Sequence, residues 1–123
     1  MSFVPPPSVT GLFPRPIRRS PANHAVAHQD LAALREALDA GADVEEAQFG
    51  TSLLHHAVDV EGDGAAQTRT PLHVDLTAFL LARGADPTRR SAATGLTAED
   101  VAMLTGHWLA TELFDAWKRE RNR

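Results

Sequence analysis

The chain has 123 residues, of which 43% are hydrophobic and 23% are charged, a balance that suits one globular domain. It contains no cysteine, which excludes disulfides and thiol chemistry, and its net charge of −4 does not favour nucleic-acid binding. No run of about 18 apolar residues is present, so no membrane span is predicted. The N-terminus also lacks the order of charges of a signal peptide. We therefore expect a cytoplasmic protein without a cofactor, and the arginine-rich, alanine-rich composition is typical of a GC-rich bacterial genome.

The N-terminal segment, residues 1–19, contains five prolines and is predicted to form an extended arm. Its apolar side chains are too numerous for a solvated tail. Two interpretations stay open. The arm either packs along the first helices as a cap, or it serves as a docking peptide for a partner.

From residue 20 onward, the sequence repeats itself. The tripeptide Gly-Ala-Asp occurs at 41–43 and again at 84–86, after helical runs at 31–40 and 76–83. Glycine tolerates the left-handed backbone conformation that stops a helix. Both runs are therefore predicted to end at these glycines.

A second pair of matching segments follows the two stops, at residues 50–57 and 95–102. Each contains a hydroxyl residue, Ser52 or Thr97, that is predicted to cap the helix it opens. In each, an alanine five residues after the hydroxyl permits close helix packing. The paired segments resemble ankyrin repeats, whose first helix opens with T-P-L-H-x-A and whose second helix ends in G-A-D.

The match to this family differs between the copies. Residues 52–57, Ser-Leu-Leu-His-His-Ala, fit the first-helix motif well. Residues 97–102 fit it loosely and are followed by the family's Gly-His pair at 106–107, and residues 20–25 are a degenerate first copy. The resemblance covers about residues 20–118.

The resemblance implies an all-α solenoid of about three stacked antiparallel helix pairs, preceded by the proline-rich arm. Hairpin fingers are expected at 43–50 and 86–95. The repeat domain would span 20–123, with repeats at about 20–51, 52–96 and 97–123. The last repeat is expected to be a C-terminal cap with a polar outer face.

The second repeat is longer than the first. From the motif alanine to the glycine stop, it spans 27 residues, against 16 in the first repeat. We therefore predict an insertion between its helices near 60–70, with Thr70 as the N-cap and Pro71 as the first residue of the following helix. Because loop length has a small energetic cost, deleting Glu61 to Gln67 is expected to leave folding nearly intact.

Six histidines raise the question of a metal or catalytic site. His24 and His28 are four residues apart and could share a metal, but the spacing fixes no third ligand. The resemblance implies that His55 is structural, bonding the backbone of a turn and holding adjacent repeats in register. His56 has no serine or carboxylate placed beside it by a known motif, so we expect neither catalysis nor a metal site.

Acidic residues are concentrated between residues 30 and 63, where nine acids and one base give a net charge of −8. We expect these acids to bind a basic protein, because complementary charge steers encounter. Phe49 would add an apolar anchor. A merely solvated surface is the alternative. The candidate partner-binding residues are Asp43, Glu45, Glu46, Phe49, Asp59, Glu61, Asp63 and Trp108.

Ankyrin resemblance implies protein binding without a fixed chemistry. We therefore expect a protein–protein interaction module, such as an immunity protein, antitoxin or inhibitor that neutralises its partner. Two alternatives stay open. One is a scaffold or accessory subunit that docks through the arm, and the other is an enzyme or metal-binding protein that uses the histidines.

Overall fold

A computed structural model describes residues 19–121, so the arm predicted at 1–19 lies, apart from Arg19, outside the described residues. The described part is mainly helical, which confirms the all-α prediction. Among residues 19–121, no helix combines the length and the apolar character that a membrane span requires. The elements are α2 (Pro21–Ala27), α3 (Leu31–Asp39), β1 (Ala47–Gln48), β2 (Thr51–Ser52), α4 (Leu53–Thr68), α5 (Asp75–Ala82), α6 (Ala98–Thr105) and α7 (Trp108–Arg121).

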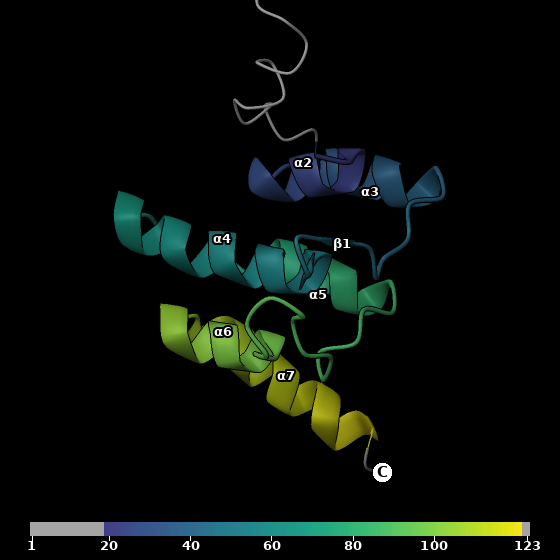
Figure 1. The fold of residues 1–123 in the computed structure, drawn as a ribbon. Helices are drawn as coiled ribbons and strands as arrows, with labels where there is room; N and C mark the ends of the chain where they lie inside the picture. Colours follow the sequence, from purple (N-terminus) through teal and green to yellow (C-terminus); the bar gives the residue numbers. More distant parts are fainter. Residues whose placement is uncertain (1–18, 122–123) are drawn as a thin grey trace, which may run out of the picture.

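The helices follow one another as three pairs, α2 with α3, α4 with α5, and α6 with α7. Figure 1 shows these pairs in three levels, with α4 and α5 between the other two. Helix α4 packs against α2 on one side and α6 on the other, as well as against its own partner α5. It is therefore the central element of the described chain.

The predicted helix caps are confirmed. The Ser52 hydroxyl accepts a hydrogen bond from the His55 amide at 3.3 Å and begins α4. Thr97 begins α6 through a capping box, in which its hydroxyl accepts from the Asp100 amide and the Asp100 carboxylate accepts from the Thr97 amide. Each cap satisfies amides that a helix start leaves without partners.

The predicted glycine stops are confirmed as well. Gly41 follows α3 with φ 108°, and Gly84 follows α5 with φ 98°. In both, the next alanine amide donates back into the helix at 3.0 Å, Ala42 to the Ala37 carbonyl and Ala85 to the Leu80 carbonyl. The two helix ends thus have the same backbone geometry.

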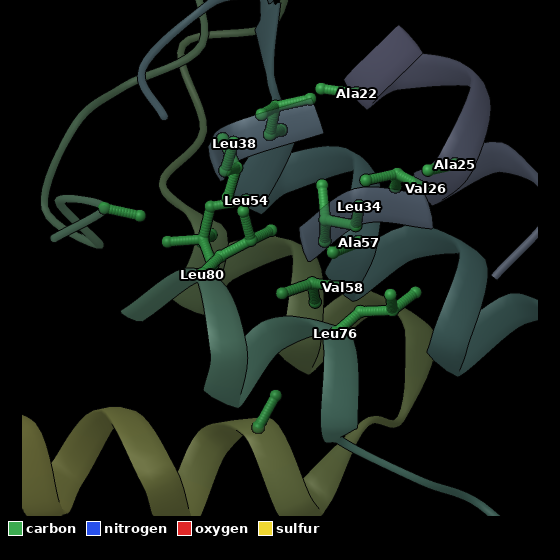
Figure 2. Close-up of a cluster of buried hydrophobic side chains, with 14 of the residues drawn as sticks. Ala22, Ala25, Val26, Leu34, Leu38, Leu54, Ala57, Val58, Leu76 and Leu80 are labelled. Carbon is green, nitrogen blue, oxygen red and sulfur yellow. The ribbon is translucent and has the colours of Figure 1, made fainter. Parts of the chain in front are cut away.

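The core lies between the pairs and is built from small and aliphatic side chains. In Figure 2, Leu34 and Leu38 of α3 lie in one cluster with residues of α4 and α5. Alanines let the helices approach closely, and Ala57 of α4 is fully buried. The labelled members of the cluster are Ala22, Ala25, Val26, Leu34, Leu38, Leu54, Ala57, Val58, Leu76 and Leu80.

The prediction of a loop near residues 60–70 is wrong. Helix α4 continues without a break to Thr68 and ends at Arg69, whose φ of 54° is left-handed. Gly62 is tolerated within α4 because α6 approaches closely there: a Cβ at Gly62 would lie 2.5 Å from Oγ1 of Thr105. The insertion is therefore a helical extension that packs against the third pair.

The start of the following helix was also predicted wrongly. Helix α5 begins at Asp75 after the N-cap position Val74, and Thr70 and Pro71 lie in the connection that precedes it. The Val74 side chain forms no capping hydrogen bond with this helix. The acceptor comes from another element, Glu61 of α4, whose carboxylate takes hydrogen bonds from the first amides of α5.

Candidate functional site

The first finger is a β-hairpin with an exposed phenylalanine in its turn. Gln48 pairs with Thr51 across antiparallel strands, so Phe49 and Gly50 form a two-residue turn. Both have positive φ, 55° and 78°. This pattern is typical of a type I′ turn, which favours glycine, asparagine and aspartate.

Phe49 is poorly suited to this conformation, because its Cβ makes a left-handed backbone cost about 1–2 kcal/mol. The side chain is 72% exposed, so burial in the described structure recovers little of that cost. Backbone strain at an exposed aromatic residue is a feature that clusters at functional positions.

Residues 86–95, for which a second hairpin was predicted, form turns without a strand pair; we keep the name second finger for this segment, which fixes the position of the Phe49–Gly50 turn. The Gly50 carbonyl accepts hydrogen bonds from the Ala92 amide at 3.0 Å and from the Ser91 hydroxyl at 3.1 Å. A Cβ at Gly50 would lie 2.8 Å from the Ala93 nitrogen, so no larger residue fits without a shift. Phe49 therefore projects from a turn with a rigid base.

The acids of the first finger have partners within the chain. Glu45 accepts from the Asp86 amide at 2.8 Å and pairs with the Arg89 guanidinium at 3.0 Å. Asp43 accepts from the Glu45 amide at 2.8 Å. The first finger is thus held to the second finger by Glu45.

Glu46 holds the same finger to the first helix pair. Its carboxylate accepts from the Ser20 hydroxyl and from the side-chain nitrogen Nδ2 of Asn23, the latter at 3.1 Å. Like Glu45, Glu46 therefore has hydrogen-bond donors within the chain. Glu45 and Glu46 tie the levels together, and their carboxylates need no external cation.

Two hollows meet beside the fingers, and we call their combined surface the finger-side groove. The first hollow, of about 240 Å³, is lined by Arg19, Asn23, Gln48, Phe49, Thr51 and His56. The second, of about 300 Å³, lies between α4, α6 and the second finger, and its lining includes Thr51, His56, Asp59, Leu96 and Leu104. Thr51 and His56 line both hollows, so the two hollows adjoin.

Apolar side chains stand at both parts of the groove. Leu104 lines the second hollow and is 74% exposed, whereas Phe49 borders the first. Leu104 was not predicted from the sequence. Its signal was present, because the buried residues of α6, Ala98 and Ala102, are spaced four apart and leave Leu104 off their face.

The two hollows of the groove differ in charge, because Arg19 lines the first and Asp59 lines the second. Burial raises the pKa of Asp59, and the neighbouring carboxylate of Asp63 raises it further, while His56 opposes the shift. Burial lowers the pKa of His56, with Arg19 adding to the effect. Within residues 19–121, no hydrogen bond or ion pair holds the Asp59 carboxylate. A cation placed beside Asp59 would therefore meet a carboxylate without an internal partner.

His55, which also lines the second hollow, has the structural role that was predicted. Its Nε2 donates to the Leu96 carbonyl at 2.8 Å, because a carbonyl can only accept. Its Nδ1 then accepts from the Ser52 hydroxyl at 2.6 Å. Both ring nitrogens are occupied, and the side chain links α4 to the segment that precedes α6.

Glu61, predicted to contact a partner, is fully buried, and that prediction is corrected here. Its Oε2 accepts from the amides of Leu76 at 3.0 Å and Thr77 at 3.3 Å. Its Oε1 accepts from the Thr77 hydroxyl and from Nε2 of His107 at 2.9 Å. The carboxylate thus caps α5 from a different helix.

His107 extends this network to α7. Its Nδ1 accepts from the Ala110 amide at 3.3 Å, so Nε2 carries the hydrogen that is donated to Glu61. The imidazole is fully buried and begins α7 in the manner of a cap. We call Glu61, Thr77 and His107 the buried clamp, because they join α4, α5 and α7.

Glu61, His73 and Asp75 lie close enough to be compared with a metal site, since ligand atoms from all three are within 4.8 Å of one another. The oxygens of Glu61, however, already accept four hydrogen bonds, which use their lone pairs. Nδ1 of His73 is within hydrogen-bond distance of Asp75 and lies 3.8 Å from Oε2 of Glu61. The geometry therefore favours a structural role for the cluster.

The other candidate residues lie outside the groove lining. Trp108, at the start of α7, is 59% exposed, and Asp63 accepts from Gln67 on the exposed face of α4. His24 and His28 have ring centroids 4.3 Å apart, but no acidic side chain of the described residues completes a three-ligand group with them.

No family model matches the sequence, and no curated protein is significantly similar to it. Function is therefore inferred from the geometry of the finger-side groove.

Proposed function

We propose that the chain is a protein-binding module of the ankyrin-repeat type, in which the fingers and the first helix of each pair present the finger-side groove to a partner. The shared backbone geometry after Gly41 and Gly84 supports a repeating unit. The hydrogen bond from His55 to the Leu96 carbonyl supports stacking of successive units, as the ankyrin motif histidine implies.

The observation that carries this proposal is Phe49. A left-handed phenylalanine lowers stability by about 1–2 kcal/mol where asparagine or glycine would not. The side chain is 72% exposed and stands on a turn whose base is fixed by Ser91 and Ala92. A large aromatic side chain on a rigid support is the type of residue that dominates binding energy at protein interfaces.

The test compares the full chain with its Phe49→Asn variant in capture of partners from the host lysate. Asparagine adopts the left-handed conformation at little energetic cost, so the unfolding free energy of this variant should rise by about 1 kcal/mol. The variant should nevertheless no longer bind the partner. The matched control is Met103→Gln, because Met103 is 67% exposed but does not line the groove.

A protein retained by wild type and by Met103→Gln, but lost by Phe49→Asn, would support the proposal. Equal retention by Phe49→Asn would refute it. Where the captured protein is an enzyme or a toxin, the proposal includes neutralisation: the wild-type chain should suppress its activity, and Phe49→Asn should not.

A further inference from the structure

We infer that the finger-side groove binds an extended protein segment that places a lysine or arginine side chain beside Asp59, with apolar neighbours against Phe49 and Leu104. This inference rests on the proposed function and adds the chemistry of the partner. It narrows the expected basic contact from the acids of residues 30–63 to Asp59, because Glu45 and Glu46 are occupied by internal contacts.

The shape of the groove supports a segment rather than a small cofactor. Each hollow has a volume of about 240–300 Å³, which is at or below the lower end for small-molecule sites. The two hollows adjoin at their shared residues, Thr51 and His56. Successive side chains of one extended segment can therefore enter the two hollows.

Apolar contacts are available in both hollows, and the charged position lies in the second. Phe49 borders the first hollow and Leu104 the second, and both are more than 70% exposed. Leu96 and Val101, each partly buried, add apolar surface to the second hollow. A segment with apolar side chains flanking a charged one would cover these surfaces, and that burial would supply most of the affinity.

The charges decide where the basic side chain lies. Asp59 lines the second hollow without an internal partner, and Asp63 follows one turn later on the same exposed face of α4. The first hollow instead contains Arg19, which would repel a cation there. Because burial and Asp63 raise the pKa of Asp59, a bound cation would also relieve an unfavourable charge interaction.

A random peptide library displayed on phage provides the probe. The full chain is used as bait, and enriched peptides are synthesised with a fluorophore for anisotropy titrations. We expect enriched peptides to carry lysine or arginine next to apolar residues, and to bind less tightly as salt rises. Asp59→Asn should weaken their binding roughly tenfold. Asp59→Lys should select acidic peptides instead.

Two control variants test whether these losses come from the groove. Asp115→Asn removes an exposed acid on α7, and Met103→Gln removes an exposed apolar side chain outside the groove; both should bind like wild type. Leu104→Asn should weaken binding as Asp59→Asn does. Circular dichroism on each variant checks that the fold is retained.

Peptides that lack basic residues, or that bind Asp59→Asn and wild type equally, would overturn this inference. If such peptides still need Phe49, the proposed binding function stands and only the partner chemistry is wrong. Failure to enrich any peptide would also overturn it, whereas Phe49-dependent capture of a folded protein would leave the proposed function intact. Self-association that is lost in Phe49→Asn would identify a second copy as the occupant and overturn the inference.

Discussion

Replacing Glu61 by alanine should destabilise the protein severely, although the sequence places this residue within a stretch that resembles a loop insertion. The carboxylate is fully buried and accepts from the amides of Leu76 and Thr77, from the Thr77 hydroxyl and from the His107 imidazole. Alanine would leave four buried donors without an acceptor.

The size of the effect follows from those donors. Each buried polar group left without a partner costs about 1–3 kcal/mol, but the Thr77 hydroxyl can rotate and local relaxation recovers part of the total. We therefore expect a loss of about 3–5 kcal/mol, as found when one partner of a buried pair is removed. Since small proteins have about 5–15 kcal/mol of stability in all, the variant should be marginally folded.

Urea unfolding, followed by circular dichroism and by tryptophan fluorescence, measures this loss. With a slope of about 2 kcal/mol per M of urea, the midpoint should fall by about 1.5–2.5 M for Glu61→Ala. The matched control is Asp63→Ala, two residues beyond on the same helix but exposed, which should change stability by less than about 0.5 kcal/mol. A double-mutant cycle with His107→Ala should give a coupling energy of about 1 kcal/mol or more.

A Glu61→Ala variant as stable as Asp63→Ala would refute the buried clamp and restore the loop predicted from the sequence. For the same reason, deleting Glu61 to Gln67 should now unfold the protein, because the deletion removes two turns of α4 together with the clamp.

Three further predictions concern the hairpin turn, the core and the groove. Gly50→Ala should lower the unfolding free energy by about 1–3 kcal/mol, because φ is 78° and the new Cβ would meet the second finger; unchanged urea unfolding would contradict the turn geometry. Ala57→Leu should overpack the buried face of α4 and cost about 1–3 kcal/mol, and a wild-type melting temperature would contradict that packing. Because burial lowers the pKa of His56, the unfolded state takes up its proton more readily, so stability should fall as pH drops below about 6.5. His56→Gln should lose less stability than wild type between neutral and acidic pH. An equal fall of the urea midpoint for both proteins over that range would contradict the lowered pKa of His56.

The parts of the fold that depend on neighbouring residues could be predicted from the sequence. The caps at Ser52 and Thr97 and the stops at Gly41 and Gly84 need only a few adjacent residues, and all four were predicted correctly. The role of His55 was predicted because the motif resemblance implies a distant backbone acceptor, which the structure identifies as Leu96.

The parts that depend on distant partners could not be predicted. Glu61 meets Leu76 and His107, which are 15 and 46 residues away, so its burial left no local signal. Glu45 meets Arg89, 44 residues away, and without that contact the acidic finger resembled a free binding surface. The exposure of Phe49 could be expected from its place in a finger. Its left-handed backbone conformation could not be predicted without knowing that Gln48 pairs with Thr51.

The central position of α4 has a consequence for how the chain folds during synthesis. Helices α2 and α3 leave the ribosome first, yet the surface on which α2 packs belongs to α4. The clamp residues that hold the far end of α4 come later still, with α5 and His107. The apolar face of the first helix pair therefore stays uncovered until α4 has been synthesised. Folding should accordingly be cooperative across all three levels rather than sequential from the N-terminus.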